Sequence, residues 1–209
     1  MKYQVGETRV SAASKEFYTY GDYETWSDDQ RWELIDGVPY DMTPAPSRRH
    51  QEILGALYLQ FATYLKGKPC RVYLAPFDVR LPEGRSETQP QTQEEDNQIK
   101  TVVQPDLTVV CDQAKLDNKG CKGAPDLSIE ITSPHTAAKD AKIKLALYEK
   151  VGIKEFWLIY PLDATVMVFT LDNNGKYGKP NVFTTGDQVP VGIFSGELSV
   201  DLDQVFEIN

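Results

Sequence analysis

Two acidic residues in separate segments are the strongest candidates for chemistry. Asp106 and Glu130 lie in the runs 105–110 and 125–130, which both begin with Pro-Asp-Leu and have the composition of strands. If these strands pair antiparallel about a turn centred on Asn118, paired positions add up to 236, and Asp106 lies opposite Glu130, with Cβ atoms about 4.5–5.5 Å apart. Carboxylates that close repel unless a cation lies between them, and oxygen ligands suit a divalent cation. The register therefore predicts a metal site at this pair.

Asp126 is a poorer partner for Glu130. The two residues lie four apart on one strand, so their Cα atoms are about 13 Å apart, too far for one small cation. In the same register Asp126 lies opposite Val110, where we expect it to serve the turn. The alternative for all these acidic residues is an ordinary solvated position on a strand.

A nuclease site also needs a positive group to orient water and neutralise charge on the phosphate. The helix expected at 137–151 carries Lys139, Lys142 and Lys144. Lys144 and Tyr148 share one helical stripe beside the apolar face, whereas Lys139 and Lys142 look more exposed. Lys144 is therefore the candidate, with Lys142 as the alternative and a solvated lysine as the non-functional interpretation.

Three further residues are candidates for the site. Glu33 lies on a short strand at 32–35, where alternation points its side chain to the opposite face from its apolar neighbours. Arg48 and His50 lie in the first turn of a long helix, where free backbone N–H groups favour a phosphate. We take Arg48 and His50 as candidate substrate-binding residues; the alternative is a solvated helix start.

The elements that must position these residues alternate along one chain of 209 residues. Periodicity and turn signals predict helices at 20–29, 47–66 and 137–151, and strands at 32–35, 38–42, 70–81, 105–110, 125–130, 154–160 and 165–171. This order predicts an α/β or α+β fold, a mixed β-sheet flanked by helices. We expect a flexible lead-in at 1–19, a single domain at 20–209, and a long polar loop at 82–100 inserted between strands.

Composition limits the classes of protein. The net charge of −9 argues against tight nucleic-acid binding, although a bound cation and a local basic patch can reverse the field near a site. No stretch has the roughly 20 apolar residues of a membrane span, and the N-terminus lacks a signal peptide's apolar core. Cys70, Cys111 and Cys121 form neither an even disulfide set nor a zinc pair, so we expect a reducing cytoplasm.

Several separated motifs, in order, carry a family pattern. They are Glu33-Leu34-Ile35-Asp36-Gly37, His50-Gln51, 103–107, 123–134, Asp140, 144–148 and 152–157. Together they resemble the Uma-two family of bacterial endonucleases, from about Tyr20 to Phe206. Their combination and order are far more specific than any one motif.

The resemblance implies a restriction-endonuclease-like fold within the PD-(D/E)XK nuclease superfamily. It implies a Mg²⁺ or Mn²⁺ site at Asp106, Glu130 and the carbonyl of Ile131, with Glu33 as an extra acidic ligand. The superfamily's lysine, two residues after the second carboxylate, is replaced here by Thr132. Lys144 resembles a lysine that has migrated to a neighbouring element, and Thr132 is kept as a candidate substrate-binding residue.

Three functions follow as hypotheses. The first is a metal-dependent endonuclease that hydrolyses DNA phosphodiester bonds with a metal-activated water. The second is a catalytically weak or inactive nuclease fold that serves as a binding module, which the acidic charge and Thr132 motivate. The third is a metal hydrolase acting on a small phosphoester. Endonucleases that cut both strands often form two-fold dimers, so a homodimer is also an expectation.

Overall fold

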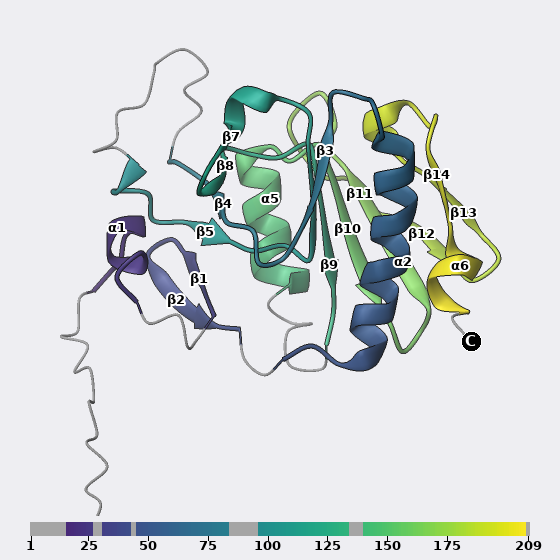
Figure 1. Cartoon of the computed structure of the whole chain (residues 1–209), viewed down its shortest axis with the longest axis horizontal. Helices are drawn as coiled ribbons and strands as arrows, with labels where there is room; N and C mark the ends of the chain where they lie inside the picture. The colour runs from purple at the N-terminus through teal and green to yellow at the C-terminus, as the bar shows by residue number, and fades with distance from the viewer. Residues whose placement is uncertain (1–15, 27–30, 43–44, 84–95, 134–139, 208–209) are drawn as a thin grey trace, which may run out of the picture.

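The computed structural model describes residues 16–26, 31–42, 45–83, 96–133 and 140–207 (Figure 1). Two six-stranded sheets dominate this part of the chain, and each contains parallel and antiparallel pairs. The predicted mixed α+β architecture is confirmed. Most of the predicted lead-in and of the loop at 82–100 lies outside the described residues.

One sheet, here called the central sheet, has the strand order β12-β11-β10-β9-β6-β3. Only β9 and β10 run parallel; the other neighbours are antiparallel. The strands are β3 (Arg71–Leu74), β6 (Leu107–Val110), β9 (Leu127–Ile131), β10 (Glu155–Tyr160), β11 (Thr165–Thr170) and β12 (Asn181–Thr184).

The other sheet, here called the peripheral sheet, has the order β2-β1-β5-β4-β8-β7. Its strands are β1 (Trp32–Ile35), β2 (Val38–Asp41), β4 (Val79–Arg80), β5 (Val102–Val103), β7 (Leu116–Asp117) and β8 (Gly120–Lys122). The β1–β2 hairpin closes through Asp36 and Gly37, whose φ angles of 48° and 82° match the turn that an Asp-Gly pair favours. This predicted hairpin is confirmed.

The described residues also form helices and short helical turns. They are α1 (Tyr20–Tyr23), α2 (Arg48–Leu65), α5 (Leu145–Val151) and α6 (Leu202–Phe206), with 3₁₀ turns η1 (Gln113–Lys115) and η3 (Gly192–Phe194) and a π-helical turn η2 (Asp140–Lys144). A small sheet of β13 (Gln188–Pro190) and β14 (Ser199–Asp201) lies beside α2. Figure 1 shows α2 and α5 on opposite sides of β9 and β10.

The core is divided by the central sheet. Alternate residues of β9, namely Leu127, Ile129 and Ile131, pack with the buried face of α2. The opposite face of the sheet packs with Leu147 and Tyr148 of α5 and with the peripheral sheet. The region between the two sheets is therefore enclosed, and side chains that point into it are shielded from water.

The long helix forms where periodicity predicts it. Ser47 caps α2 by accepting a hydrogen bond from the His50 backbone N–H, at 3.2 Å. The predicted third helix is confirmed over Asp140–Val151 and ends at Gly152, whose φ of 85° suits glycine. Its predicted first residues, 137–139, lie outside the described part.

The prediction of one strand at 70–81 is wrong. The segment forms β3 in the central sheet and β4 in the peripheral sheet, with a break at Ala75 and Pro76. Proline has no backbone N–H, so Pro76 cannot continue a ladder, and the chain passes from one sheet to the other there.

The expectation that the cysteines form no disulfide is also wrong. Cys70 and Cys111 are bonded, with Cα atoms 3.9 Å apart, and Cys121 is free and buried. The β3–β6 register pairs Arg71 with Val110, so the next position outward brings these two cysteines together. An odd cysteine count therefore does not support the inference of a reducing compartment. No helix among the described residues is long and apolar enough to cross a membrane.

Candidate metal centre

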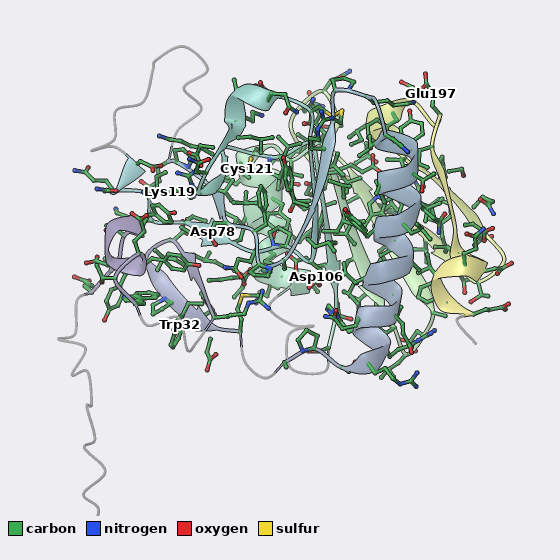
Figure 2. All side chains as sticks on the ribbon, viewed as in Figure 1. Trp32, Asp78, Asp106, Lys119, Cys121 and Glu197 are labelled. Atoms are coloured by element: carbon green, nitrogen blue, oxygen red, sulfur yellow. A yellow bond between two sulfur atoms is a disulfide. The ribbon has the colours of Figure 1, made fainter. Side chains whose placement is uncertain are left out.

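The β6–β9 ladder brings the two predicted carboxylates together. Leu107 pairs with Ile129, and the ladder continues inward with positions that add up to 236, as the sequence predicts. One step outward in the same register, Asp106, which directly precedes β6, lies opposite Glu130 of β9, and its Oδ2 binds the backbone N–H of the next residue, Ile131. Figure 2 shows Asp106 between the peripheral sheet and α2.

Glu130 points away from α2. Its neighbours Ile129 and Ile131 face that helix, so alternation turns Glu130 toward α5 and the peripheral sheet. There its Oε1 accepts hydrogen bonds from Lys144 Nζ at 2.8 Å and from Tyr148 Oη at 2.6 Å. Glu130 is thus held by two donors one helical turn apart.

Lys144, rather than Lys142, reaches the carboxylates. The side chain of Lys144 is 1% exposed, and its Nζ also lies 2.7 Å from Glu33 Oε1. That oxygen of Glu33 accepts from the Gln104 backbone N–H at 3.0 Å. Lys142 is exposed. The lysine is thus fixed between carboxylates from the two sheets, at the end of the π-helical turn, an irregularity frequent at functional sites.

Asp106 is held through one of its oxygens. Oδ2 accepts from the Ile131 backbone N–H at 2.7 Å and lies 3.2 Å from His50 Nε2. Among the described residues, Oδ1 makes no hydrogen bond or ion pair. Because the N–H and C=O of a strand residue point to the same side, the Ile131 carbonyl also faces β6.

Tyr148 was not among the candidate site residues in the sequence, although its position relative to Lys144 could have identified it. It lies four residues after Lys144 on one stripe, so any partner of the lysine is within reach of the phenol. What the stripe does not reveal is Glu130, the shared partner on another element.

Other candidates lie apart from the carboxylates or are already occupied. Arg48 is exposed and pairs with Glu52 on its own helix, and Arg49 donates to the Phe206 carbonyl at 2.5 Å. The Thr132 hydroxyl donates to the Ile159 carbonyl at 3.0 Å, so its proton is used within the sheet.

Asp126 takes the structural role that the sequence predicts. Its Oδ2 accepts from the Cys111 backbone N–H at 2.7 Å, and its Oδ1 lies 2.7 Å from Lys154 Nζ. These bonds secure the end of the β6–β9 ladder remote from Glu130.

A polar network supports the centre from the peripheral sheet. Gln104 Nε2 donates to Asp78 Oδ1 at 2.8 Å and to the Tyr23 hydroxyl at 3.0 Å. Burial raises the pKa of the Asp78 carboxyl, partly offset by hydrogen bonds from Gln104 and Tyr23, and burial together with Asp78 raises the pKa of Tyr23. Since the backbone of Gln104 also binds Glu33, the network fixes the segment that holds Lys144 in place.

The donor set fits a hard divalent cation. Glu33, Asp106 and Glu130 with Lys144 have a formal charge of −2, and the available atoms are oxygens, which Mg²⁺ and Mn²⁺ prefer. Over the described ranges, no cluster of three or more His, Cys, Asp or Glu is arranged to hold a metal. Mg²⁺ commonly takes one or two carboxylates and keeps several waters, so a two-carboxylate site remains compatible with it.

The comparisons with known proteins identify the family and a similar fold. The sequence model of the family Uma2, described as "Putative restriction endonuclease", matches residues 20–92 and 94–203. A crystal structure titled as a putative nuclease belonging to DUF820, from Anabaena variabilis ATCC 29413, is similar in fold: the TM-score is 0.68 at 21% identity, covering 90% of this chain and 97% of that one. The comparison with curated proteins gave no match.

Proposed function

The chain belongs to the Uma2 family, and from its site we propose that it is a metal-dependent endonuclease that hydrolyses DNA phosphodiester bonds. The observation that supports the proposal is Asp106, bound to the backbone N–H of Ile131 at 2.7 Å, next to Glu130, which binds Lys144 at 2.8 Å. In this arrangement the carboxylates would hold a cation that activates water, and the lysine would stabilise the charge that develops on the phosphate.

Three groups would hold Mg²⁺ or Mn²⁺: the carboxylates of Asp106 and Glu130 and the backbone carbonyl of Ile131. When bound, the cation would lower the pKa of a water ligand and polarise the phosphoryl oxygens. The chain's own contribution is orientation. Asp106 is fixed by Ile131 N–H and His50, and Glu130 by Lys144 and Tyr148, so neither carboxylate must be ordered when the cation arrives.

Lys144 would stabilise the charge that develops on the phosphate. Its side chain is nearly fully buried, where an electrostatic interaction is stronger than in water. Glu33 binds Lys144 at 2.7 Å and keeps its ammonium beside Glu130. In this proposal Glu33 orients the lysine, which is a different task from the metal-ligand role that the family resemblance implies.

Plasmid cleavage in the presence of Mg²⁺ or Mn²⁺ tests the proposal. We expect the wild type to nick supercoiled DNA and Asp106→Ala and Glu130→Ala to lose more than about 100-fold in rate, because both remove a metal ligand. Asp163→Ala, an exposed carboxylate in the turn before β11, is the matched control and should cleave like the wild type. Equal residual nicking by wild type and Asp106→Ala would overturn the proposal.

A second candidate function is a binding module with a decayed nuclease site. It is favoured by the burial of Glu33, Glu130 and Lys144 and by the net charge of −9, which disfavours DNA. Calorimetric titration with Mn²⁺ separates the two: binding that disappears in Glu130→Ala supports a working metal centre, and the absence of binding supports the module. Cleavage of a chromogenic phosphodiester without any cleavage of DNA would instead indicate a small-phosphoester hydrolase. The homodimer and the cytoplasmic location stay predictions.

A further inference from the structure

We propose that His50 is a positioning residue that fixes Asp106 for the cation, and that it does not bind substrate phosphate. The inference rests on the proposed function, since it assigns a role within that metal centre. It departs from the expectation that helix-start residues Arg48 and His50 both meet the substrate.

The side chain of His50 points inward from the first turn of α2. It is 11% exposed, and its Nε2 lies 3.2 Å from Asp106 Oδ2. Arg48, two residues earlier, has 86% of its side chain exposed. The same helix start thus sends one cationic side chain to solvent and the imidazole to a carboxylate of the candidate site.

No atom of the imidazole remains for a phosphate. Nε2 faces Asp106, and Nδ1 is buried without a hydrogen-bond partner in the part of the chain that the structure describes. A ligand reaching the ring would have to displace Asp106 from Nε2 or open the packing around Nδ1. Contact with a substrate phosphate would therefore disrupt the arrangement that holds the carboxylate.

The imidazole acts together with a backbone group on one oxygen. Asp106 Oδ2 accepts from Ile131 N–H at 2.7 Å, and His50 Nε2 lies 3.2 Å from the same oxygen. With its proton on Nε2, the imidazole would be a second donor to that oxygen, and two donors on one oxygen restrict rotation of the carboxylate. The other oxygen, Oδ1, makes no contact of this kind with any described residue. The two donors thus bind one side of Asp106 and leave Oδ1 to meet a cation.

The rest of α2 holds the backbone of His50 in a fixed position. Ser47 caps the helix at the His50 backbone N–H, and Ile53, Leu54 and Leu57 are buried in the core against the central sheet. A donor on a packed helix loses little entropy when it binds, and loss of such a supporting partner costs 10–100-fold in metal affinity or activity.

Two near-isosteric substitutions test the role. The amide nitrogen of Gln reaches about as far as Nε2, whereas that of Asn reaches only as far as Nδ1. Titration of the purified full chain with Mn²⁺ should give His50→Gln an affinity within about threefold of wild type, and His50→Asn an affinity about 10–100-fold weaker. In plasmid cleavage at saturating Mn²⁺, the KM for DNA should stay unchanged in both variants.

The opposite results are equally definite. Unchanged Mn²⁺ affinity with a raised KM in His50→Asn would overturn the inference and restore the phosphate-binding role. Equal weakening in folded Gln and Asn variants would also overturn it, since the donor position would then not matter. If His50→Asn fails to fold, weakened binding by His50→Gln alone is sufficient to overturn it. If the wild type binds no Mn²⁺, both the proposed function and the role of His50 are overturned. If the wild type binds Mn²⁺ and Glu130→Ala abolishes that binding but His50→Asn does not weaken it, only the role of His50 is overturned.

Discussion

Arg80 and Lys144 are both cations with almost fully buried side chains, and each contacts two carboxylates, yet the charges around them differ. Arg80 lies on β4 in the peripheral sheet and binds both oxygens of Asp96 and both oxygens of Asp117, at 2.6–2.9 Å. Lys122 adds a second cation, 3.4 Å from Asp96. Two positive and two negative groups balance in this cluster.

The candidate metal centre has a different ratio of carboxylates to lysine. Lys144 contacts one oxygen of Glu33 and one of Glu130, and Asp106 adds a third carboxylate, bound to the backbone N–H of Ile131 next to Glu130. These three carboxylates and the lysine together have a formal charge of −2. In this comparison the Arg80 cluster has the composition of a structural ion-pair network. The net negative charge of the group around Glu130 is what a bound divalent cation would neutralise under the proposed function.

The pKa of Asp117 supports the structural role of Arg80. Burial raises this pKa, but hydrogen bonds from Arg80 and from backbone N–H groups lower it more, so the net shift is downward. A carboxyl with a lowered folded-state pKa contributes stability above its unfolded pKa, and this contribution is lost as the pH falls through the folded value. The pairing should therefore persist through neutral pH and weaken only in acid.

Replacement of Lys144 should have the largest effect. Lys144→Met leaves Glu33 and Glu130 buried without their cation, so we expect a loss of about 3–5 kcal/mol in the free energy of unfolding and loss of cleavage. Because three carboxylates remain, added Mn²⁺ should recover part of the stability. Urea unfolding with and without Mn²⁺ measures both, and Lys142→Met, an exposed neighbour, should be neutral. A Lys144→Met variant as stable as the wild type would show that Lys144, unlike Arg80, does not stabilise the buried carboxylates around it.

Replacement of Arg80 should have a smaller effect that metal does not reverse. We expect Arg80→Met to lose about 3 kcal/mol, the lower end for a broken buried pair, because the Asp117 side chain is 47% exposed. Mn²⁺ affinity should be unchanged in the folded variant. The stability difference from the wild type should shrink only in acid, as the pH falls from the unfolded Asp pKa of about 3.9 through the lowered folded-state pKa of Asp117. Recovery of stability by Mn²⁺ would show that the two clusters are not distinct.

Neutralisation of Asp106 should have the smallest effect on stability. Asp106→Asn can keep the bond from the Ile131 N–H and the contact with His50 while removing one negative charge, so we expect a gain of about 1 kcal/mol without metal. The wild type should gain about 2.7 kcal/mol at a Mn²⁺ concentration 100 times Kd, and the variant almost nothing. Thermal unfolding with and without Mn²⁺ checks both expectations. If metal-free Asp106→Asn is less stable than the wild type, the charge of the Asp106 carboxylate is already neutralised by groups of the protein, and this expectation is wrong.

The site could be predicted from sequence where near neighbours encode it. The turn at Asp117–Gly120 predicts the register that places Asp106 beside Glu130, although β7 and β8 themselves join the other sheet. Helical periodicity places Lys144 and Tyr148 on one stripe, and both reach Glu130. Ser47 and the apolar spacing after it define α2. The register, the stripe and the helix cap each depend on residues within one element or about one turn, whereas the meeting of the stripe with Glu130 depends on tertiary packing.

Tertiary structure alone decided which elements meet. The contact of Glu33 with Lys144, and that of His50 with Asp106, join segments that no local pattern relates. The same holds for the Cys70–Cys111 disulfide and for the division of 70–81 between two sheets. Periodicity and turn chemistry specify which way a side chain points from its own element. What it meets depends on how sheets and helices stack, and that is set by burial summed over the whole core.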